Sequence, residues 1–314
     1  MRPGCWLVLL IALLSSSPSR GELIYAATGN EQGWQLFWFD SEAPGTPLGS
    51  LPLFGDFDDY IQFRIEFDPW THELYAFGYP NCQITCPPSP IDPARIDLAT
   101  GEMTLLNWPE FPSGWLSLHD IRIDPQTREV RAIGYQGRNY RYSLNSLELH
   151  EDVDLNTPGW YVALAHTPAG GEHGGETLAI RHQTSVGPAG LLARIGGVGG
   201  DPSASSGQVT LLGEILGPYF VSGFDIAVNG SAYLLGAVGP YGPQHLFGLD
   251  LATLETQDFG LIVPPSGSDY IMGIAAAPPG FGQSVVEVPA LSKLGLVVLT
   301  ILLAGVALRR WKVG

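Results

Sequence analysis

Lysine is absent from residues 22–287 of this 314-residue chain, and arginine is scarce there. Nine arginines stand against 31 acidic residues in this segment, so its net charge is −22, compared with −16 for the whole chain. A surface of that sign repels nucleic acids and anionic lipids at long range. The composition therefore excludes nucleic acid as a partner and leaves cationic ligands, calcium or simple solubility as reasons for the charge.

Cysteine is also rare. Cys5 precedes the apolar run 6–14 and should leave with a signal peptide, which leaves Cys82 and Cys86. An oxidising compartment would pair these two in a disulfide. The spacing also fits half of a metal site, but no second Cys/His pair at metal spacing follows. So short a loop constrains the unfolded chain little, and the disulfide should contribute at the low end of about 0–5 kcal/mol.

Catalytic signatures are missing as well. The sequence has no nucleophile elbow and no two-histidine zinc helix, and a phosphate loop of the Walker type needs a lysine that residues 22–287 lack. Asp56, Asp58 and Asp59 form an acidic cluster whose oxygens suit calcium, although the segment lacks the length and glycine placement of an EF-hand loop. A solvated loop explains the cluster equally well in so acidic a chain. We expect no cofactor, with calcium left open.

The two ends of the chain carry apolar runs. Arg2, the apolar run 6–14 and the small polar residues 15–19 predict a signal peptide over residues 1–21. At the other end, residues 288–308 contain Lys293 as their only charge and are long enough for a transmembrane helix. Arg309, Arg310 and Lys312 place the C-terminus in the cytoplasm by the positive-inside rule. We therefore expect an exported protein that is anchored in the inner membrane with residues 22–287 outside.

Residues 288–314 resemble the bacterial IPTL-CTERM sorting tail. The matching pattern is a short motif, a glycine near the start of the span and a basic pair at its end: Val288, Pro289, Ala290, Leu291, Ser292, Gly295, Arg309 and Arg310. Val288 and Ala290 replace the usual isoleucine and threonine. The resemblance implies that an exosortase-like enzyme cuts near the motif and delivers the protein to the cell surface or extracellular matrix. A plain single-pass anchor is the alternative.

Between the two ends, short β-branched and aromatic runs alternate with turn residues, which is typical of an all-β protein. The segment 65–78 recurs as 121–134, each reading as strand, Asp-Pro turn and strand, and weaker copies begin at 164 and 224. Asp accepts backbone N–H bonds within such a turn and Pro presets φ. The pattern therefore predicts a repeated β-unit, which is typical of proteins built from copies of one supersecondary unit.

A fifth copy is divided between the chain ends. Residues 274–280 supply its first strand and residues 21–27 its second, so Leu23 to Ala27 should pair with the strand near Ile271 to Ala275. The turn positions 69, 125, 168, 228 and 278 are about 52 residues apart on average, enough for a four-stranded blade. Closing the ring removes exposed sheet edges. The sequence predicts a β-propeller of five four-stranded blades over residues 22–280, followed by a linker at 281–287. A β-sandwich or two small β domains is the alternative, but no linker divides 22–280.

The repeat consensus runs from an Asp-Pro turn into Leu-Tyr-Ala-x-Gly and then an apolar-Asp-x-x-Thr-Gly segment, as at 94–101. It resembles a family of secreted bacterial β-propellers of unknown function that often carry such sorting tails. The resemblance implies the fold and export. It transfers no catalytic residue, because the matching positions are turns and strands.

Two functions follow from these features. The first is an exported, non-catalytic surface or matrix propeller that binds a polymer, such as an exopolysaccharide, or a surface protein. Among the tryptophans, Trp38 alternates within a strand and should be buried, while Trp70 lies at an Asp-Pro turn and suits an exposed contact. The second is a secreted hydrolase or lyase with a site at the central channel. Three or more carboxylates or histidines converging at the channel mouth would favour that enzyme.

Overall fold

The computed structural model describes residues 21–30, 33–55, 60–80, 92–106, 118–134, 137–144, 146, 148–157, 159–168, 174–182, 190–201, 203–239, 242–267 and 270–281. Residues 1–20 of the predicted signal peptide, the acidic cluster at 56–59, Cys82, Cys86 and the predicted sorting tail lie outside these residues. The chain divides into two compact units, residues 1–278 and 279–314, and the first contains every strand given below.

Three of the sheets have four antiparallel strands each, in sequence order. The first consists of β8 (Leu118–Ile123), β9 (Glu129–Gly134), β10 (Asn139–Ser143) and β11 (Leu149–Glu151). The second consists of β12 (Trp160–His166), β13 (Thr177–His182), β14 (Gly190–Ile195) and β15 (Val209–Glu214). The third consists of β16 (Phe220–Ile226), β17 (Ala232–Ala237), β18 (Gln244–Leu249) and β19 (Thr256–Leu261).

The fourth sheet has eight strands in the order β20-β1-β2-β3-β7-β6-β5-β4. One half contains β20 (Ile271–Ala276), β1 (Leu23–Asn30), β2 (Gly33–Asp40) and β3 (Pro47–Gly55). The other half contains β4 (Tyr60–Phe67), β5 (Leu74–Pro80), β6 (Asp92–Ile96) and β7 (Glu102–Leu105). The halves meet through a parallel contact of β3 with β7 that pairs only Phe54 with Glu102 and Gly55 with Met103. Each half is therefore an antiparallel four-stranded run like the other three sheets.

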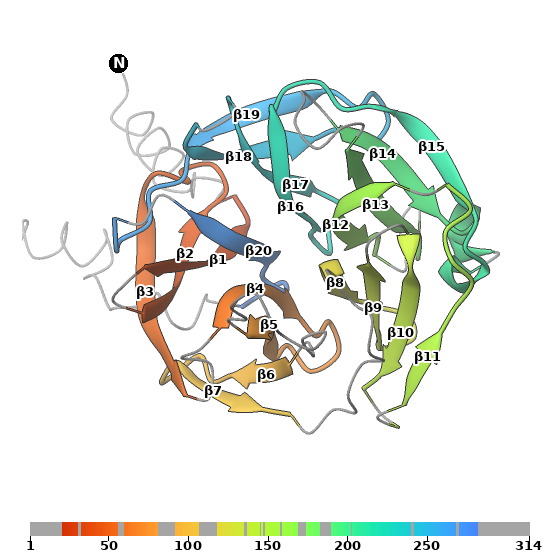
Figure 1. Ribbon diagram of the computed structural model, residues 1–314. Coiled ribbons are helices and arrows are strands. Elements are labelled where there is room, and N and C mark those ends of the chain that lie inside the picture. The colour runs from red at the N-terminus through yellow and green to blue at the C-terminus, as the bar shows by residue number, and fades with distance from the viewer. Residues whose placement is uncertain are drawn as a thin grey trace, which may run out of the picture. The chain divides into compact units, whose positions relative to one another are not determined.

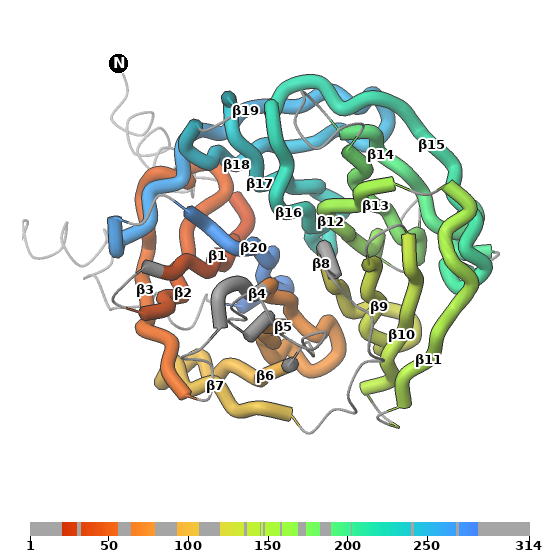
Figure 2. The backbone as a smooth tube through the Cα atoms, in the orientation of Figure 1, coloured from red at the N-terminus to blue at the C-terminus, as the bar shows by residue number. Residues whose placement is uncertain are grey.

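The predicted pairing of the two chain ends is confirmed. β1 lies between β2 and β20, with Ile24 opposite Ala276 and Ala26 opposite Ile274. The amide of Ala277 also donates to the carbonyl of Leu23 at 2.8 Å. Figure 2 shows the red N-terminal strand beside the blue C-terminal one. Pairing gives both strands the backbone partners that an open edge would lack.

Five strands, one from each four-stranded run, surround a common axis (Figure 1). They are β4, β8, β12, β16 and β20, and each contacts the next, with β20 returning to β4. The pairing of each inner strand with its neighbour shifts register near the axial strand's start, as a β-bulge does. The five inner strands thus share the same irregularity at the same place in the strand.

The core lies between neighbouring runs. One cluster packs Leu178 and Ile180 of β13 against Phe224 of β16 and Leu234 of β17. Another cluster involves the half-sheet β20-β1-β2-β3, which we call the closing run because it joins the two chain ends. It packs Ile24 and Phe37 of this run with Ile274 of β20 and with residues of β17 and β18. Apolar burial between faces of adjacent sheets is the main favourable term here. It holds the runs side by side, so that the inner strands meet at the axis.

The Asp-Pro turns form as predicted. In the first copy Asp68 Oδ1 accepts the amide of Trp70 at 2.9 Å, and in the second Asp124 Oδ1 accepts the amide of Gln126 at 2.7 Å. Each turn closes with a residue at positive φ, His72 at 60° and Arg128 at 58°. The turn therefore fixes where each inner strand ends and where the chain turns outward into the next strand.

Helix is almost absent from the described residues, which contain the short 3₁₀ segments η2 (Val198–Gly200) and η3 (Ala204–Ser206). Among the residues that the structure describes, no helix is long and apolar enough to span a membrane. The predicted span at 288–308 lies outside them.

Ile24→Ala should destabilise the protein strongly, because Ile24 is fully buried in β1 between the two strands that complete the closing run. We expect the free energy of unfolding to fall by about 2–5 kcal/mol. Leu48→Ala is the matched control, since Leu48 in β3 of the same run is 49% exposed and should change stability by about 0.5 kcal/mol or less. Urea denaturation measures both. Equal midpoints for the two variants would contradict a structural role for the closing strand.

Candidate functional site

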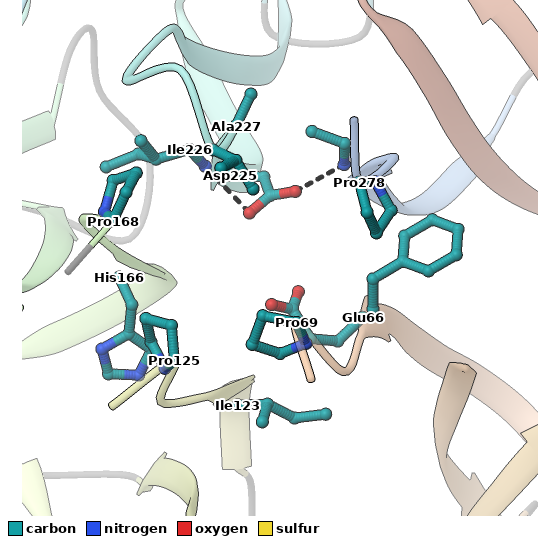
Figure 3. Close-up of a pocket in the computed structure, with 13 residues that line it drawn as sticks. Glu66, Pro69, Ile123, Pro125, His166, Pro168, Asp225, Ile226, Ala227 and Pro278 are labelled. Carbon is teal, nitrogen blue, oxygen red and sulfur yellow. Dashed lines mark hydrogen bonds between the residues drawn. The ribbon is translucent and has the colours of Figure 1, made fainter. Parts of the chain in front are cut away.

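A cavity opens where the inner strands end (Figure 3). Its volume is about 190 Å³. The five turn positions of the repeats all line it: Pro69, Pro125, Pro168, Val228 and Pro278. Because the same turn ends each inner strand, the repeat places one small apolar residue from each run at this end of the axis. The rest of the wall contains Phe67, Ile123, Ile226, Ala227 and Ala276, with Glu66, Asp225 and His166 as the polar members.

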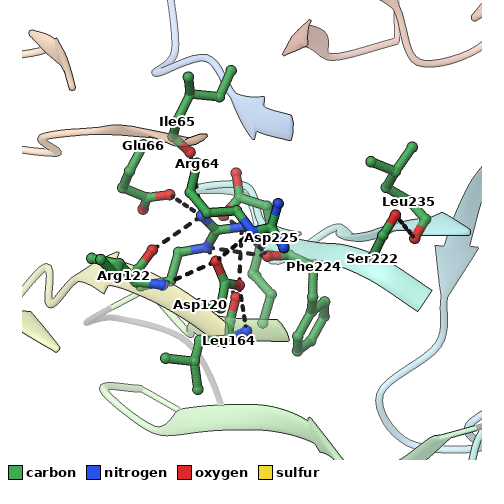
Figure 4. Close-up of polar contacts among 12 residues, drawn as sticks. Arg64, Ile65, Glu66, Asp120, Arg122, Leu164, Ser222, Phe224, Asp225 and Leu235 are labelled. Carbon is green, nitrogen blue, oxygen red and sulfur yellow. Dashed lines mark hydrogen bonds and ion pairs between the residues drawn. The ribbon is translucent and has the colours of Figure 1, made fainter. Parts of the chain in front are cut away.

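Arg122 lies on the axis behind the cavity and is 1% exposed. Its guanidinium donates to main-chain carbonyls of three other inner strands. Nε donates to Leu164 O at 2.9 Å, Nη2 to Phe224 O at 2.7 Å and Nη1 to Ile65 O at 3.2 Å. These three residues occupy the same position in β12, β16 and β4, one place before the column that holds Arg122 in β8. A single side chain therefore ties four inner strands together (Figure 4).

Carboxylates surround this guanidinium. Glu66 lies 3.2 Å and Asp120 lies 3.6 Å from Arg122 nitrogens, and Asp120 also lies 3.5 Å from Nε of Arg64. Asp120 Oδ2 accepts the amide of Leu164 on the next inner strand at 2.7 Å. Ion pairs and backbone bonds together compensate the large cost of taking these charges out of water.

Asp225 makes a comparable bridge between two other inner strands. Its Oδ1 accepts its neighbour Ile226 N at 2.8 Å, and its Oδ2 accepts Ala276 N on β20 at 2.6 Å. The carboxylates of Asp225 and Glu66 point into the space between the prolines in Figure 3. Both are lining residues of the cavity that also hold the ring of strands together.

The pKa values follow from burial and from an excess of carboxylates. Burial raises the pKa of Glu66 well above its ordinary value, and Arg122 opposes this rise only in part. Burial likewise raises the pKa of Asp225, against the opposing effects of Arg122 and of two backbone N–H groups. Burial alone would lower the pKa of Arg122, but Asp120, Glu66 and Asp225 outweigh it and raise that pKa. Arg122 therefore stays charged, while the carboxylates compete for it.

His166 contributes to the wall but its ring is directed elsewhere. Nδ1 lies 3.2 Å from the hydroxyl of Thr177 on the neighbouring strand, and the residue is 7% exposed. Burial lowers the pKa of His166 from 6.5 to about 4, with Asp124 opposing and Arg131 adding to the shift. In Figure 3 the imidazole lies beside Pro125, away from the space between the two carboxylates. His166 is thus a neutral wall residue at neutral pH.

Trp70 lies beside the cavity, as an exposed residue. It follows Pro69, one of the five turn residues that form the rim of the cavity. Its indole N–H donates to the carbonyl of Pro125, another of these rim residues, at 2.9 Å. Its side chain remains 62% exposed, whereas Trp38 is half-buried and packs on Tyr25 at a ring distance of 5.6 Å. Trp70 is thus exposed as predicted, whereas Trp38, predicted to be buried, is only partly so, because the two phenylalanines that flank it in β2 are buried and point to the opposite face.

The axial charges were not singled out by the sequence analysis. Glu66, Arg122 and Asp225 occupy one column of the repeat, directly before the Phe or Ile of each turn, where the other two copies have Ala165 and Ala275. Aligning the five copies by their turns would have exposed this signal. Each of the three charged residues is the second-to-last residue of its inner strand, and a charged side chain at such a buried position is expensive unless it is paired, which marks the axis.

The described residues offer no group of three or more His, Cys, Asp or Glu side chains placed to hold a metal ion. The calcium candidates Asp56, Asp58 and Asp59 and the cysteine pair lie outside those residues. They stay predictions.

No protein-family model matches the chain, and no curated protein matches it. Solved structures resemble it in fold. TolB from Acinetobacter baumannii is 11% identical with a TM-score of 0.52, over 86% of this chain and 70% of the TolB chain. A protein of unknown function from Bacteroides thetaiotaomicron is 10% identical with a TM-score of 0.52, over 84% of this chain and 66% of its own. These likenesses and the sheet topology place the chain in the class of all-β, propeller-like proteins.

Arg122→Met should destabilise the protein by about 3–5 kcal/mol, because the carbonyls and carboxylates around the guanidinium lose their shared partner while staying buried. Arg95→Met is the control, since Arg95 is 54% exposed and its pair with Glu73 lies at the surface. That change should cost about 0–1 kcal/mol. Chemical denaturation gives both values. Wild-type stability in Arg122→Met would show that the strands hold together without the axial guanidinium.

His166 should make the fold sensitive to acid. Because the pKa of His166 is about 4 in the folded protein and its ordinary value is 6.5, the unfolded chain binds more protons between these values, and stability falls as pH drops from 6.5 to 4. Glu66 and Asp225 have raised pKa values and contribute the opposite slope. His166→Phe should therefore lose less stability than wild type over this window, measured by melting temperature at each pH. Parallel curves would contradict the assignment.

Proposed function

We propose that the protein is an exported, non-catalytic β-propeller of five four-stranded blades that binds a polymer or a protein partner at the cell surface or in the extracellular matrix. The five runs, their inner strands and the closing pair β1 and β20 support the blade number. The β3–β7 contact involves two residue pairs and joins the outer edges of two blades without changing their order.

The proposal of export depends on the sequence of the two ends. The predicted signal peptide and the resemblance of residues 288–314 to a sorting tail support an inner-membrane precursor that an exosortase-like enzyme processes. The charge of −22 on residues 22–287 suits an exterior domain that stays soluble and avoids nucleic acid.

The rim of the axial cavity is the observation that supports a binding function. Its five turn residues come from all five runs, and Trp70 presents an exposed indole beside them in an orientation held by Pro125. A fixed aromatic face suits stacking on a sugar ring or packing against a protein side chain. Repetition of one turn around the axis gives a binding surface without requiring any catalytic residue.

Catalysis is the second candidate, and one observation favours it: two carboxylates with raised pKa values, Glu66 and Asp225, line the same cavity. Perturbed carboxyl groups in a cavity are typical of active sites. Among the described residues, however, the ring of His166 turns toward Thr177, so two groups rather than three converge. Both carboxylates also have structural partners, which favours the binding function.

Mature protein extracted from the cell surface would test both parts of the proposal. Its intact mass should lack residues 1–21 and most of residues 294–314. The mature protein should bind a polymer on a glycan array or a protein in a cross-linking experiment on whole cells. Trp70→Ala should weaken that binding about 3- to 10-fold, the usual value of an aromatic contact.

Val153→Ala is the matched control, because Val153 is also 62% exposed but does not line the cavity. Equal losses in the two variants would remove Trp70 from the binding surface. Turnover of a bound glycan that disappears in Glu66→Gln would replace the binding function with the enzymatic one.

A further inference from the structure

The axial cavity combines a charged end with an apolar rim. Glu66 and Asp225 supply the carboxylates, and the prolines with Phe67, Ile123 and Ile226 supply the apolar wall. Its volume of about 190 Å³ corresponds to roughly six water molecules at about 30 Å³ each. A short unbranched chain of about five or six heavy atoms therefore fits.

The charges around the cavity do not balance. Counted in their ionised forms, Glu66, Asp120 and Asp225 outnumber the guanidinium groups of Arg64 and Arg122 by one. The raised pKa values of Glu66 and Asp225 show that the two guanidinium groups compensate these carboxylates only in part, so a cation beside them would favour their ionised forms. Glu66 is 9% exposed, and its Oε2 receives no hydrogen bond although Nη1 of Arg122 lies 3.2 Å away. Two incompletely compensated carboxylates that line one cavity attract a positively charged donor.

The donor set selects among cations. Calcium takes six to eight oxygen ligands, and the described residues around this cavity offer no group of three or more metal-ligating side chains. An ammonium group needs only three acceptors. Lone pairs remain on Asp225, because a carboxylate oxygen can accept two hydrogen bonds and each of its oxygens accepts one from a backbone amide. Oε2 of Glu66 accepts none. A hydrated metal ion has no apolar surface to pack against the rim, whereas an alkyl chain has.

We infer that this cavity binds an alkylammonium group, as carried by a lysine side chain of a partner protein or by a free aliphatic amine. The ammonium lies between Glu66 and Asp225, and the carbon chain follows the proline rim. This inference deepens the proposed binding function, since it names the chemistry that the axial end recognises.

Calorimetric titration with n-butylammonium chloride tests the inference, with sodium chloride at equal ionic strength and n-butanol as references. Butylammonium should bind saturably with one site, while sodium and butanol give no saturable heat. Butanol binding as tightly as butylammonium would overturn the role of charge. Absence of saturable butylammonium binding would overturn the inference altogether.

Variants locate the site. Glu66→Gln should weaken butylammonium binding about tenfold or more, as expected for a lost hydrogen bond to a charged group. Ala276→Leu fills the cavity wall, keeps both carboxylates and should abolish binding. Glu255→Gln removes one exposed carboxylate outside the cavity and should bind like wild type. Wild-type affinity in Ala276→Leu would move the site elsewhere, and this variant decides the question even if Glu66→Gln fails to fold.

Two further titrations separate the sources of the amine. A short peptide with one capped lysine represents a protein partner, and 1,4-diaminobutane represents a free amine; the tighter ligand identifies the source. Saturable butylammonium binding by a protein that retains no polymer or protein on cells would leave the inference standing and reject the proposed function. If the protein retains a partner on cells and the Ala276→Leu variant retains it equally well, the proposed function would stand and the inference about the cavity would be rejected.

Discussion

The arrangement of the inner strands depends on the guanidinium of Arg122. Among the residues that the structure describes, inner strands of neighbouring runs do not share a hydrogen-bonded ladder, so their carbonyls at the axis need other donors. Arg122 supplies them to Leu164, Phe224 and Ile65 at once. Arginine suits this position because its planar fork presents five donors and stays charged when buried. A lysine could not reach three strands with the same geometry.

This solution creates the chemistry of the cavity. A buried guanidinium requires carboxylates nearby, and the chain places three of them around Arg122 and Arg64. Two of these carboxylates, those of Glu66 and Asp225, line the cavity at the end of the axis. The raised pKa values of Glu66 and Asp225 follow from the same burial that holds the ring together. Structure and recognition therefore share the same residues, and changes to either carboxylate affect both.

The sequence predicted the all-β class and the pairing of the chain ends because both follow from local patterns. An Asp-Pro turn has the same mechanism wherever it occurs, and a strand without a partner at each end of the chain implies closure. The same turns also align Glu66, Arg122 and Asp225 in one column of the repeat, so their shared position was predictable. Their ion pairs were not, because the three residues lie far apart in sequence and only the ring of inner strands brings them together. The cysteine pair, the acidic cluster at 56–59 and the sorting tail lie outside the described residues, so their assignment depends on the sequence alone.

The pairing of β1 with β20 also determines when the fold can be completed. β1 is the first of these strands to be synthesised and β20 is the last. The pairing of Ile24 with Ala276 therefore cannot form until almost the whole domain has been synthesised. Contacts this distant along the chain form slowly, because the entropy of closing a long loop is lost before the contact stabilises anything. Until then one edge of β1 has no strand beside it, and a nascent chain with an open edge is prone to aggregate. In this protein, pairing of β20 with β1 therefore competes with intermolecular association through the unpaired edge of β1.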